Sequence, residues 1–100
     1  MPDNKKSQKK FEEGMADFVN HNYGQSIEHL SQAIDLDPEF TLAFKSRGAA
    51  YLRLGNAEQA IADFNAVIEM DSSNARAYHL RGLAYEKAGE NDKALRDFNQ

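Results

Sequence analysis

The sequence predicts an all-α fold, a right-handed α-solenoid of helix-turn-helix hairpins, and two observations support this prediction. First, residues 47–65 return at residues 81–99 after a shift of 34 positions, with arginine, glycine, alanine and phenylalanine in register. Second, the apolar residues of each copy recur at the spacing of an amphipathic helix. A hairpin of this size cannot bury its outer face alone, so we expect the copies to stack.

The repeat length divides the chain into four segments. We expect a basic polar tail at residues 1–6 and three copies of the repeat at residues 7–40, 41–74 and 75–100. The first copy is the most divergent. The third is incomplete, because its second helix should run about five to seven residues beyond Gln100. This pattern favours an excised piece of a longer array, and the alternative is an edge that another chain covers.

Each copy predicts two helices joined by a turn. Gly55 and Gly89 mark the turns of the second and third copies. Between copies, Pro38 cannot continue a helix, and Ser73 or Asn74 can cap the helix that follows.

Glycine also occurs inside the first helix of the second and third copies, at Gly48 and Gly82. Glycine inside a helix costs about 0.5–1 kcal/mol relative to alanine. We therefore expect the second helix of each hairpin to approach closely there, through Phe64 and Phe98. The first copy departs from the pattern at Asp17, His21 and Ser26, as a terminal capping unit does.

Composition excludes several classes of function. The 100 residues contain no cysteine, which rules out disulfides, zinc-thiolate sites and cysteine nucleophiles. No apolar run of about 18 residues predicts a membrane span, so we expect a cytoplasmic protein without a membrane partner. The net charge of −4 disfavours nucleic acid as a partner.

Sites for catalysis or metal binding are also not predicted. His21, His29 and His79 lie in different elements without a partner at metal-ligand spacing, and Asp35 and Asp37 belong to a junction. There is no phosphate-binding loop or nucleophile elbow. We expect a non-enzymatic protein with no cofactor and no metal.

The motifs resemble those of the tetratricopeptide repeat family. The resemblance rests on the 34-residue hairpin, the helix glycine, the alanine and large apolar residue of the second helix, and Leu36-Asp37-Pro38 at a junction. The Arg-Gly and Asp-Phe dipeptides are similar to a common variant of the repeat. Arg47 with Asp63, and Arg81 with Asp97, are therefore either paired across each hairpin or separately solvated.

The resemblance implies a concave groove lined by the first helix of each copy, in which a segment of a partner protein binds. The residues that map to it are Phe11, Met15, Phe18, Leu42, Lys45, Ser46, Ala49, Leu52, Arg53, Arg76, His79, Leu80, Leu83 and Glu86. Phe11, Met15 and Phe18 form one helical stripe, and this stripe is either core or an apolar half of the groove.

Family members that bind chaperone tails grip a terminal carboxylate with lysine, asparagine and arginine. The matching positions here are Phe11, Met15, Ser46, Arg76 and Leu80, of which only Arg76 is suitable. One arginine cannot replace the solvation of a free carboxylate.

We therefore expect an apolar or amphipathic peptide or helix as the ligand, with Lys45, Arg53 and Arg76 favouring some acid in it. The alternative is a self-assembling scaffold segment, a homo-oligomer formed through Leu95 and Phe98 at the exposed edge of the third copy.

Overall fold

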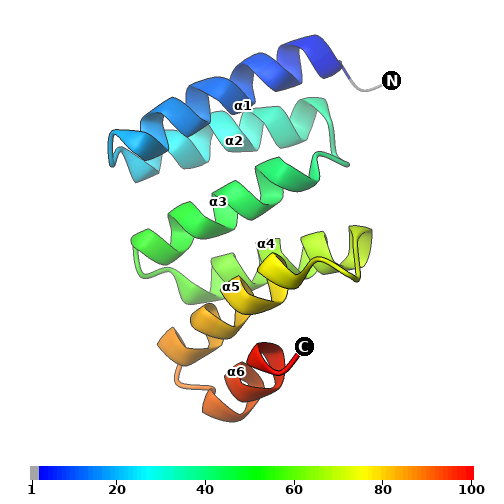
Figure 1. The fold of residues 1–100 in the computed structure, drawn as a ribbon. Helices are drawn as coiled ribbons and strands as arrows, with labels where there is room; N and C mark the ends of the chain where they lie inside the picture. The colour runs from blue at the N-terminus through cyan, green and yellow to red at the C-terminus, as the bar shows by residue number, and fades with distance from the viewer. Residues whose placement is uncertain (1–2) are drawn as a thin grey trace.

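The computed structural model describes residues 3–100, and within them it contains six helices and no strand. The helices are α1 (Asn4–Val19), α2 (Tyr23–Leu36), α3 (Thr41–Arg53), α4 (Ala57–Met70), α5 (Ala75–Lys87) and α6 (Asn91–Phe98). Each helix packs on the next, so that three hairpins follow one another in a stack measuring 40 × 27 × 17 Å (Figure 1). The predicted all-α solenoid of hairpins is confirmed.

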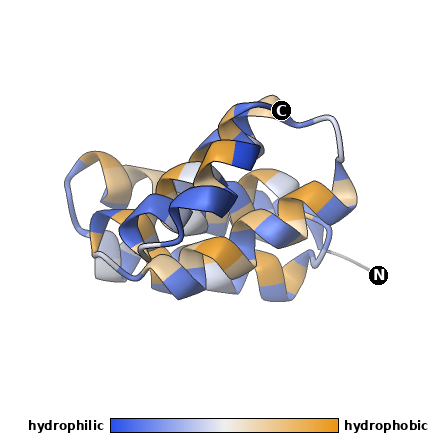
Figure 2. Ribbon diagram, turned by 90° about the horizontal axis from the view of Figure 1, so that it is seen from below, coloured by the Kyte–Doolittle hydropathy of each residue, from blue (hydrophilic) through white to orange (hydrophobic). Residues whose placement is uncertain are grey.

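Apolar and polar residues are interspersed along every helix, and no helix is wholly apolar or wholly polar (Figure 2). This is the pattern expected when each helix buries one face against its neighbours and leaves the other in water. None of the helices described is long and apolar enough to cross a membrane.

Two of the helices begin at a side-chain cap. Asp3 caps α1 and Asn74 caps α5, and each accepts a hydrogen bond from the backbone N–H three residues on, at 3.0 and 3.1 Å. The first helix therefore begins at Asn4, ahead of the boundary expected at Ser7. Residues 1–2 of the expected tail lie outside the described residues.

The turns within the hairpins share one backbone conformation. Gly55 and Gly89 have φ of +81° and +80°, in the left-handed region that favours glycine. His21 occupies the matching position of the first hairpin with φ of +63°, which is less favourable for a residue with a side chain. The Tyr23 hydroxyl lies 2.7 Å from His21 Nδ1 and holds this turn.

The glycines inside α3 and α5 allow close helix packing, as expected. A Cβ atom at Gly48 would lie 2.6 Å from Cε1 of Phe64, and one at Gly82 would lie 2.5 Å from Cε1 of Phe98. Phe64 is fully buried, whereas Phe98 is 39% exposed. The contact between glycine and phenylalanine is thus buried in the second hairpin and partly open to water in the third.

Polar residues of the first hairpin are buried and hydrogen-bonded. Ser26 Oγ donates to the carbonyl of Gly14 at 2.8 Å, and Ser7 Oγ donates to the carbonyl of Ala33 at 3.0 Å. Satisfied hydroxyls of this kind cost little on burial. The substitution of alanine by serine in this copy is therefore compatible with the same packing.

A partly buried ion pair joins α3 to α4, with the Asp63 carboxylate on its buried side. Arg47 donates from Nε and Nη2 to the two carboxylate oxygens of Asp63, at 2.9 and 2.7 Å, and from Nη1 to Ser31 Oγ of α2 at 3.0 Å. Burial raises the pKa of the Asp63 carboxyl, and the Arg47 hydrogen bonds oppose this shift. The same hydrogen bonds raise the pKa of Arg47. Of the two alternatives for Arg47, pairing with Asp63 or separate solvation, the pairing is confirmed.

The third hairpin repeats this arrangement. Arg81 donates from Nε and Nη2 to Asp97 at 2.8 and 2.7 Å, and from Nη1 to Asn65 of α4 at 2.9 Å. Its hydrogen bonds to Asp97 raise the pKa of Arg81. Each arginine thus bonds its own hairpin and the preceding one.

The first hairpin has a different pair at these positions, with a carboxylate on its first helix and a histidine on its second. Glu13 and His29 stand where the second copy has Arg47 and Asp63. His29 Nε2 lies 3.1 Å from Glu13 Oε2, and His29 Nδ1 lies 2.6 Å from Asp17 Oδ2. Asp17 and His29, which both replace residues of the repeat pattern, therefore contact each other.

We predict that Arg47→Ala lowers the free energy of unfolding by about 3 kcal/mol, because it leaves the Asp63 carboxylate buried without its partner. Without the Arg47 hydrogen bonds, which lower the pKa of the Asp63 carboxyl, burial raises that pKa further in the variant than in the unmodified protein. The carboxyl is then protonated more readily in the folded variant, so the loss should be smaller at about pH 4.5 than at about pH 7. Urea unfolding followed by circular dichroism measures both values. Lys93→Ala, which breaks the exposed pair of Lys93 with Glu90, is the control and should change stability by less than about 1 kcal/mol. Equal effects of the two substitutions would contradict this account.

We predict that Gly48→Ala is more destabilising than Gly82→Ala. The new methyl group clashes with an enclosed ring at Gly48, which should cost about 1–3 kcal/mol. At Gly82 the partly exposed ring of Phe98 can move aside, and the better helix propensity of alanine offsets part of the cost. Melting temperatures of the two variants give the comparison, and the reverse order would show that the two contacts are not enclosed as described.

Candidate functional site

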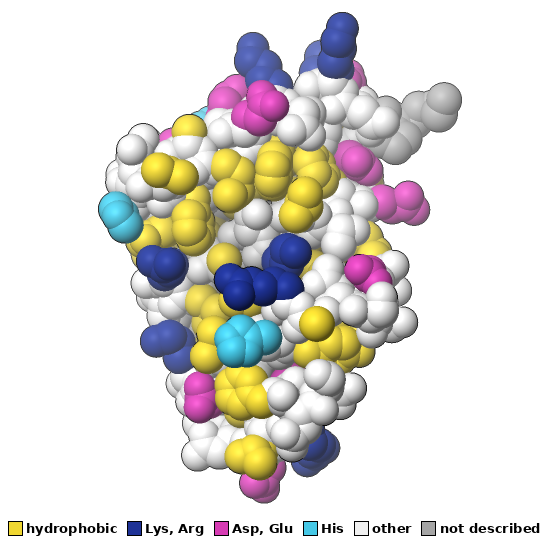
Figure 3. Space-filling view, viewed as in Figure 1, with side chains coloured by type: hydrophobic (Ala, Val, Ile, Leu, Met, Phe, Trp, Pro, Cys, Tyr) yellow, Lys and Arg dark blue, Asp and Glu magenta, His cyan; other side chains and the backbone are white. Residues whose placement is uncertain are grey.

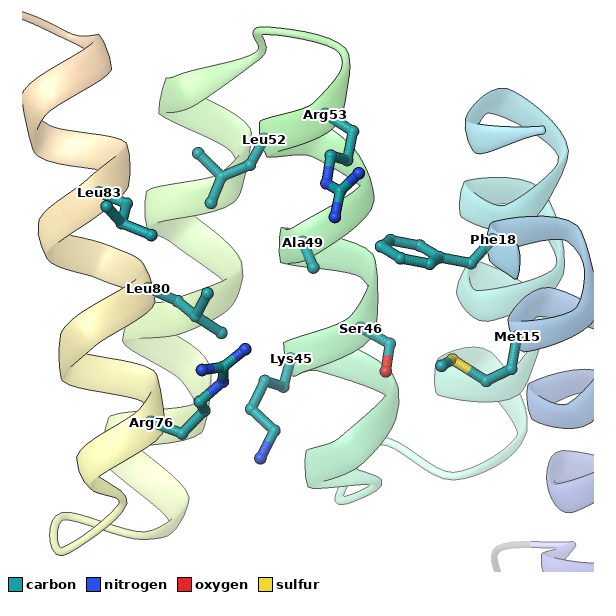
Figure 4. Close-up of a pocket in the computed structure, with 10 residues that line it drawn as sticks. All are labelled: Met15, Phe18, Lys45, Ser46, Ala49, Leu52, Arg53, Arg76, Leu80 and Leu83. Atoms are coloured by element: carbon teal, nitrogen blue, oxygen red, sulfur yellow. The ribbon is translucent and has the colours of Figure 1, made fainter. Parts of the chain in front are cut away.

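A pocket of about 440 Å³ opens between the first helices of the three hairpins (Figure 4). Its volume lies within the range typical of ligand sites. The residues that line it come from α1, α3 and α5 and are Met15, Phe18, Lys45, Ser46, Ala49, Leu52, Arg53, Arg76, Leu80 and Leu83.

Helical periodicity explains why these residues share one surface. Those from α3 stand at positions 45, 46, 49, 52 and 53, which follow the three- and four-residue spacing of one helix face. Arg47, on another face of α3, is held by its bonds to α2 and α4. These bonds fix the rotation of α3 and so turn the groove residues toward the pocket.

The pocket combines an apolar lining with basic side chains. Leu52 is only 9% exposed and belongs to a buried cluster, against which Leu80 and Leu83 pack. Lys45, Arg53 and Arg76 add three positive charges, and none of the lining residues is acidic. Figure 3 shows Lys and Arg side chains across the middle of this face, below a band of hydrophobic side chains, with Asp and Glu toward its margins.

Arg53 has a defined position in the pocket. Its guanidinium carbon lies 5.5 Å from the ring centre of Phe18 and 5.8 Å from that of Tyr23. Its Nη1 also donates to the Tyr23 hydroxyl at 3.2 Å. Such contacts between a cation and aromatic rings are favourable and orient the guanidinium.

A second depression adjoins the pocket and extends the groove. It shares Leu52, Arg53 and Leu83 with the pocket and adds Glu86 and Lys87 of α5. Glu86, which we expected on the inward surface, therefore lies beyond the pocket itself.

Three other residues expected in the groove also lie outside the pocket. The Phe11 ring lies 4.9 Å from that of Phe40 and packs against the core cluster between α2 and α3, so the predicted stripe on α1 divides between core and pocket. Leu42 is 51% exposed and stands one turn before Lys45, beyond the pocket. The His79 ring lies 5.6 Å from that of Phe98, turned toward α6.

Tyr23 is the residue that the sequence did not reveal. It lies at the start of α2, in the second helix of a hairpin, and it contacts Arg53 across 30 positions of the chain. We had expected only first helices to line the groove. The sequence offers no signal for this contact, because the repeats have no aromatic residue in register with it.

Within residues 3–100, no group of three or more His, Asp or Glu side chains has an arrangement that could hold a metal ion. The exposed edge expected at the end of the stack lies on α6. Leu95 is 62% exposed there, and Phe98 covers Gly82 while it remains partly open to water.

Comparison with known proteins shows what this chain resembles. A family model described as "TPR repeat" matches residues 48–89. No sequence among curated proteins shows significant similarity to the whole chain.

Solved structures resemble the chain over nearly its whole length. The first TPR of Spaghetti (RPAP3), bound to an HSP90 peptide, is 26% identical, with 98% of this chain and 78% of that chain covered and a TM-score of 0.95. The Arabidopsis OM64 TPR domain is 27% identical, with 95% and 78% covered and a TM-score of 0.92. MamA is 29% identical, with 97% of this chain but 57% of MamA covered and a TM-score of 0.90.

These likenesses agree with the 34-residue repeat and the stacked hairpins: residues 48–89 match the TPR repeat, and the chain as a whole has the fold of the TPR domains among these structures.

Proposed function

We propose that this protein is a non-enzymatic interaction module that binds an apolar or amphipathic segment of a partner protein in its groove. The observation that carries the proposal is the pocket itself, in which an apolar lining between three helices is joined by Lys45, Arg53 and Arg76. An apolar pocket with a few convergent polar groups is the usual form of a binding site.

The solved structures support a peptide as the type of ligand. The first and the second TPR of Spaghetti (RPAP3) are each bound to an HSP90 peptide, and the second TPR domain of human RPAP3 is in complex with an HSP70 peptide. From these proteins we carry over to this chain only that the fold can bind a peptide.

The lining argues against a chaperone tail as the ligand here. Of the positions that the resemblance assigns to the carboxylate clamp, Met15 and Leu80 place apolar groups in the pocket, and Phe11 packs in the core. Arg76 alone supplies a positive charge among them. A buried terminal carboxylate requires several convergent donors, so an internal segment with apolar side chains suits this pocket better.

A second candidate function is self-association through α6. It is favoured by the exposure of Leu95, which is 62%, next to that of Phe98. Apolar side chains exposed together at a helix surface favour contact with another apolar surface.

We predict that a peptide-display selection on the purified protein enriches segments with apolar residues and some acid, and that Leu83→Glu abolishes this enrichment. The substitution places a carboxylate in the apolar part of the groove. Leu42→Glu is the matched control, because Leu42 is exposed outside the pocket, and it should leave the enrichment unchanged. Circular dichroism checks that both variants are folded. Enrichment that survives Leu83→Glu would contradict binding in this groove.

We predict that self-association, where it occurs, is lost on Leu95→Glu. Phe98 is unsuitable for this test because it packs on Gly82, whereas Leu95 is exposed and can change without disturbing that contact. Light scattering over a range of protein concentrations gives the mass. A mass that stays monomeric in the unmodified protein, or an oligomer that survives Leu95→Glu, would exclude this edge.

A further inference from the structure

The basic side chains of the pocket stand at its two ends. Lys45 and Arg76 lie together at one end, and Arg53 lies at the other (Figure 4). Lys45 and Arg53 are eight positions apart on α3, which corresponds to about 12 Å along the helix. The positive charge is therefore divided between two places instead of forming one clamp.

The surface between these ends is apolar. Ala49 and Leu52 of α3 face Leu80 and Leu83 of α5, and Phe18 approaches from α1 (Figure 4). A ligand that spans both ends must therefore present apolar side chains in its middle.

These three cations are available to a ligand. Among residues 3–100, no carboxylate lies within ion-pair distance of Lys45, Arg53 or Arg76, whereas Arg47 and Arg81 are both paired. The protein as a whole carries a net charge of −4. Unpaired positive charge on one face of an acidic protein is complementary to an anionic partner.

Arg53 is also preorganised. Its contacts with the rings of Phe18 and Tyr23 and its hydrogen bond to the Tyr23 hydroxyl hold the guanidinium before a ligand arrives. Less conformational entropy is then lost on binding.

We infer that the groove binds an amphipathic helix of a partner protein that carries two acidic residues seven positions apart and apolar residues three and four positions after the first. In a helix, such positions share one face, and the two acidic residues are about 10.5 Å apart along the axis. The acids then meet Arg53 at one end and Lys45 with Arg76 at the other, with two apolar side chains between them.

An extended segment fits this surface less well. It covers about 12 Å in four residues, and its side chains alternate, so only one of the residues between the acids faces the pocket. That leaves much of the apolar lining uncovered. The inference rests on the proposed function and specifies the ligand of the same groove.

Two synthetic peptides test the inference by fluorescence anisotropy. The first is an alanine-based helix of about 14 residues, long enough to be partly helical, with two glutamates seven positions apart and two leucines between them on the same face. The second has glutamine in place of both glutamates. We expect the first to bind about tenfold or more tightly than the second at low salt, and we expect the difference to shrink at high salt.

Variants of the protein test whether the cations at each end of the pocket bind the glutamates of the peptide. Arg53→Gln, and separately Lys45→Gln combined with Arg76→Gln, should each weaken binding of the glutamate peptide about three- to tenfold and should weaken binding of the glutamine peptide clearly less. Lys9→Gln, at an exposed position of α1 outside the pocket, removes one positive charge as Arg53→Gln does; it is the control for that variant and should have no effect.

Several outcomes would overturn the inference. One is that the glutamate and glutamine peptides bind equally well and that Leu83→Glu abolishes the binding of both. This result would leave the proposed function of the groove intact. Another is equal binding of a third peptide with its glutamates on the face opposite the leucines, which would indicate general charge attraction. If no peptide binds, the inference fails, and the display selection decides separately whether the groove binds any segment.

Discussion

The ion pair of Arg47 with the buried carboxylate of Asp63 is the contact on which the rest of this structure depends. It joins α3 to α4 within one hairpin, and its third hydrogen bond, to Ser31, joins the same hairpin to the one before. Because adjacent helix positions are rotated by about 100°, fixing Arg47 on one side of α3 fixes which residues face the groove on the other. The pair of Arg47 with Asp63, on the side of α3 away from the groove, thus sets the orientation of the groove residues.

Differences among the three hairpins are as informative as their likeness. The first replaces the arginine and aspartate by Glu13 and His29, and it adds Asp17 beside the histidine. The third keeps the ion pair, but its phenylalanine is partly open to water. The second hairpin is covered on both sides, and it supplies half of the residues that line the pocket.

Much of the fold and part of the site could be predicted from the sequence, because a repeat fixes both the helix period and the register between copies. The close packing of Phe64 on Gly48 followed from residues that recur at one offset, whereas the pairing of Arg47 with Asp63 was only one of two alternatives until the structure settled it. Contacts that break the repeat could not be predicted in this way. Tyr23 reaches Arg53 from another hairpin, and Phe11 packs on Phe40 at a seam between copies, so neither position is set by the period of one helix.

The most direct test of the binding groove is a titration of ¹⁵N-labelled protein with a peptide taken from the display selection, followed by amide chemical shifts. The account predicts that the largest changes fall on Ala49, Leu52 and Leu83, while α6 stays unaffected. Changes centred on Leu95 and its neighbours, with the residues of the groove unchanged, would contradict it and would place the interaction at the end of the stack.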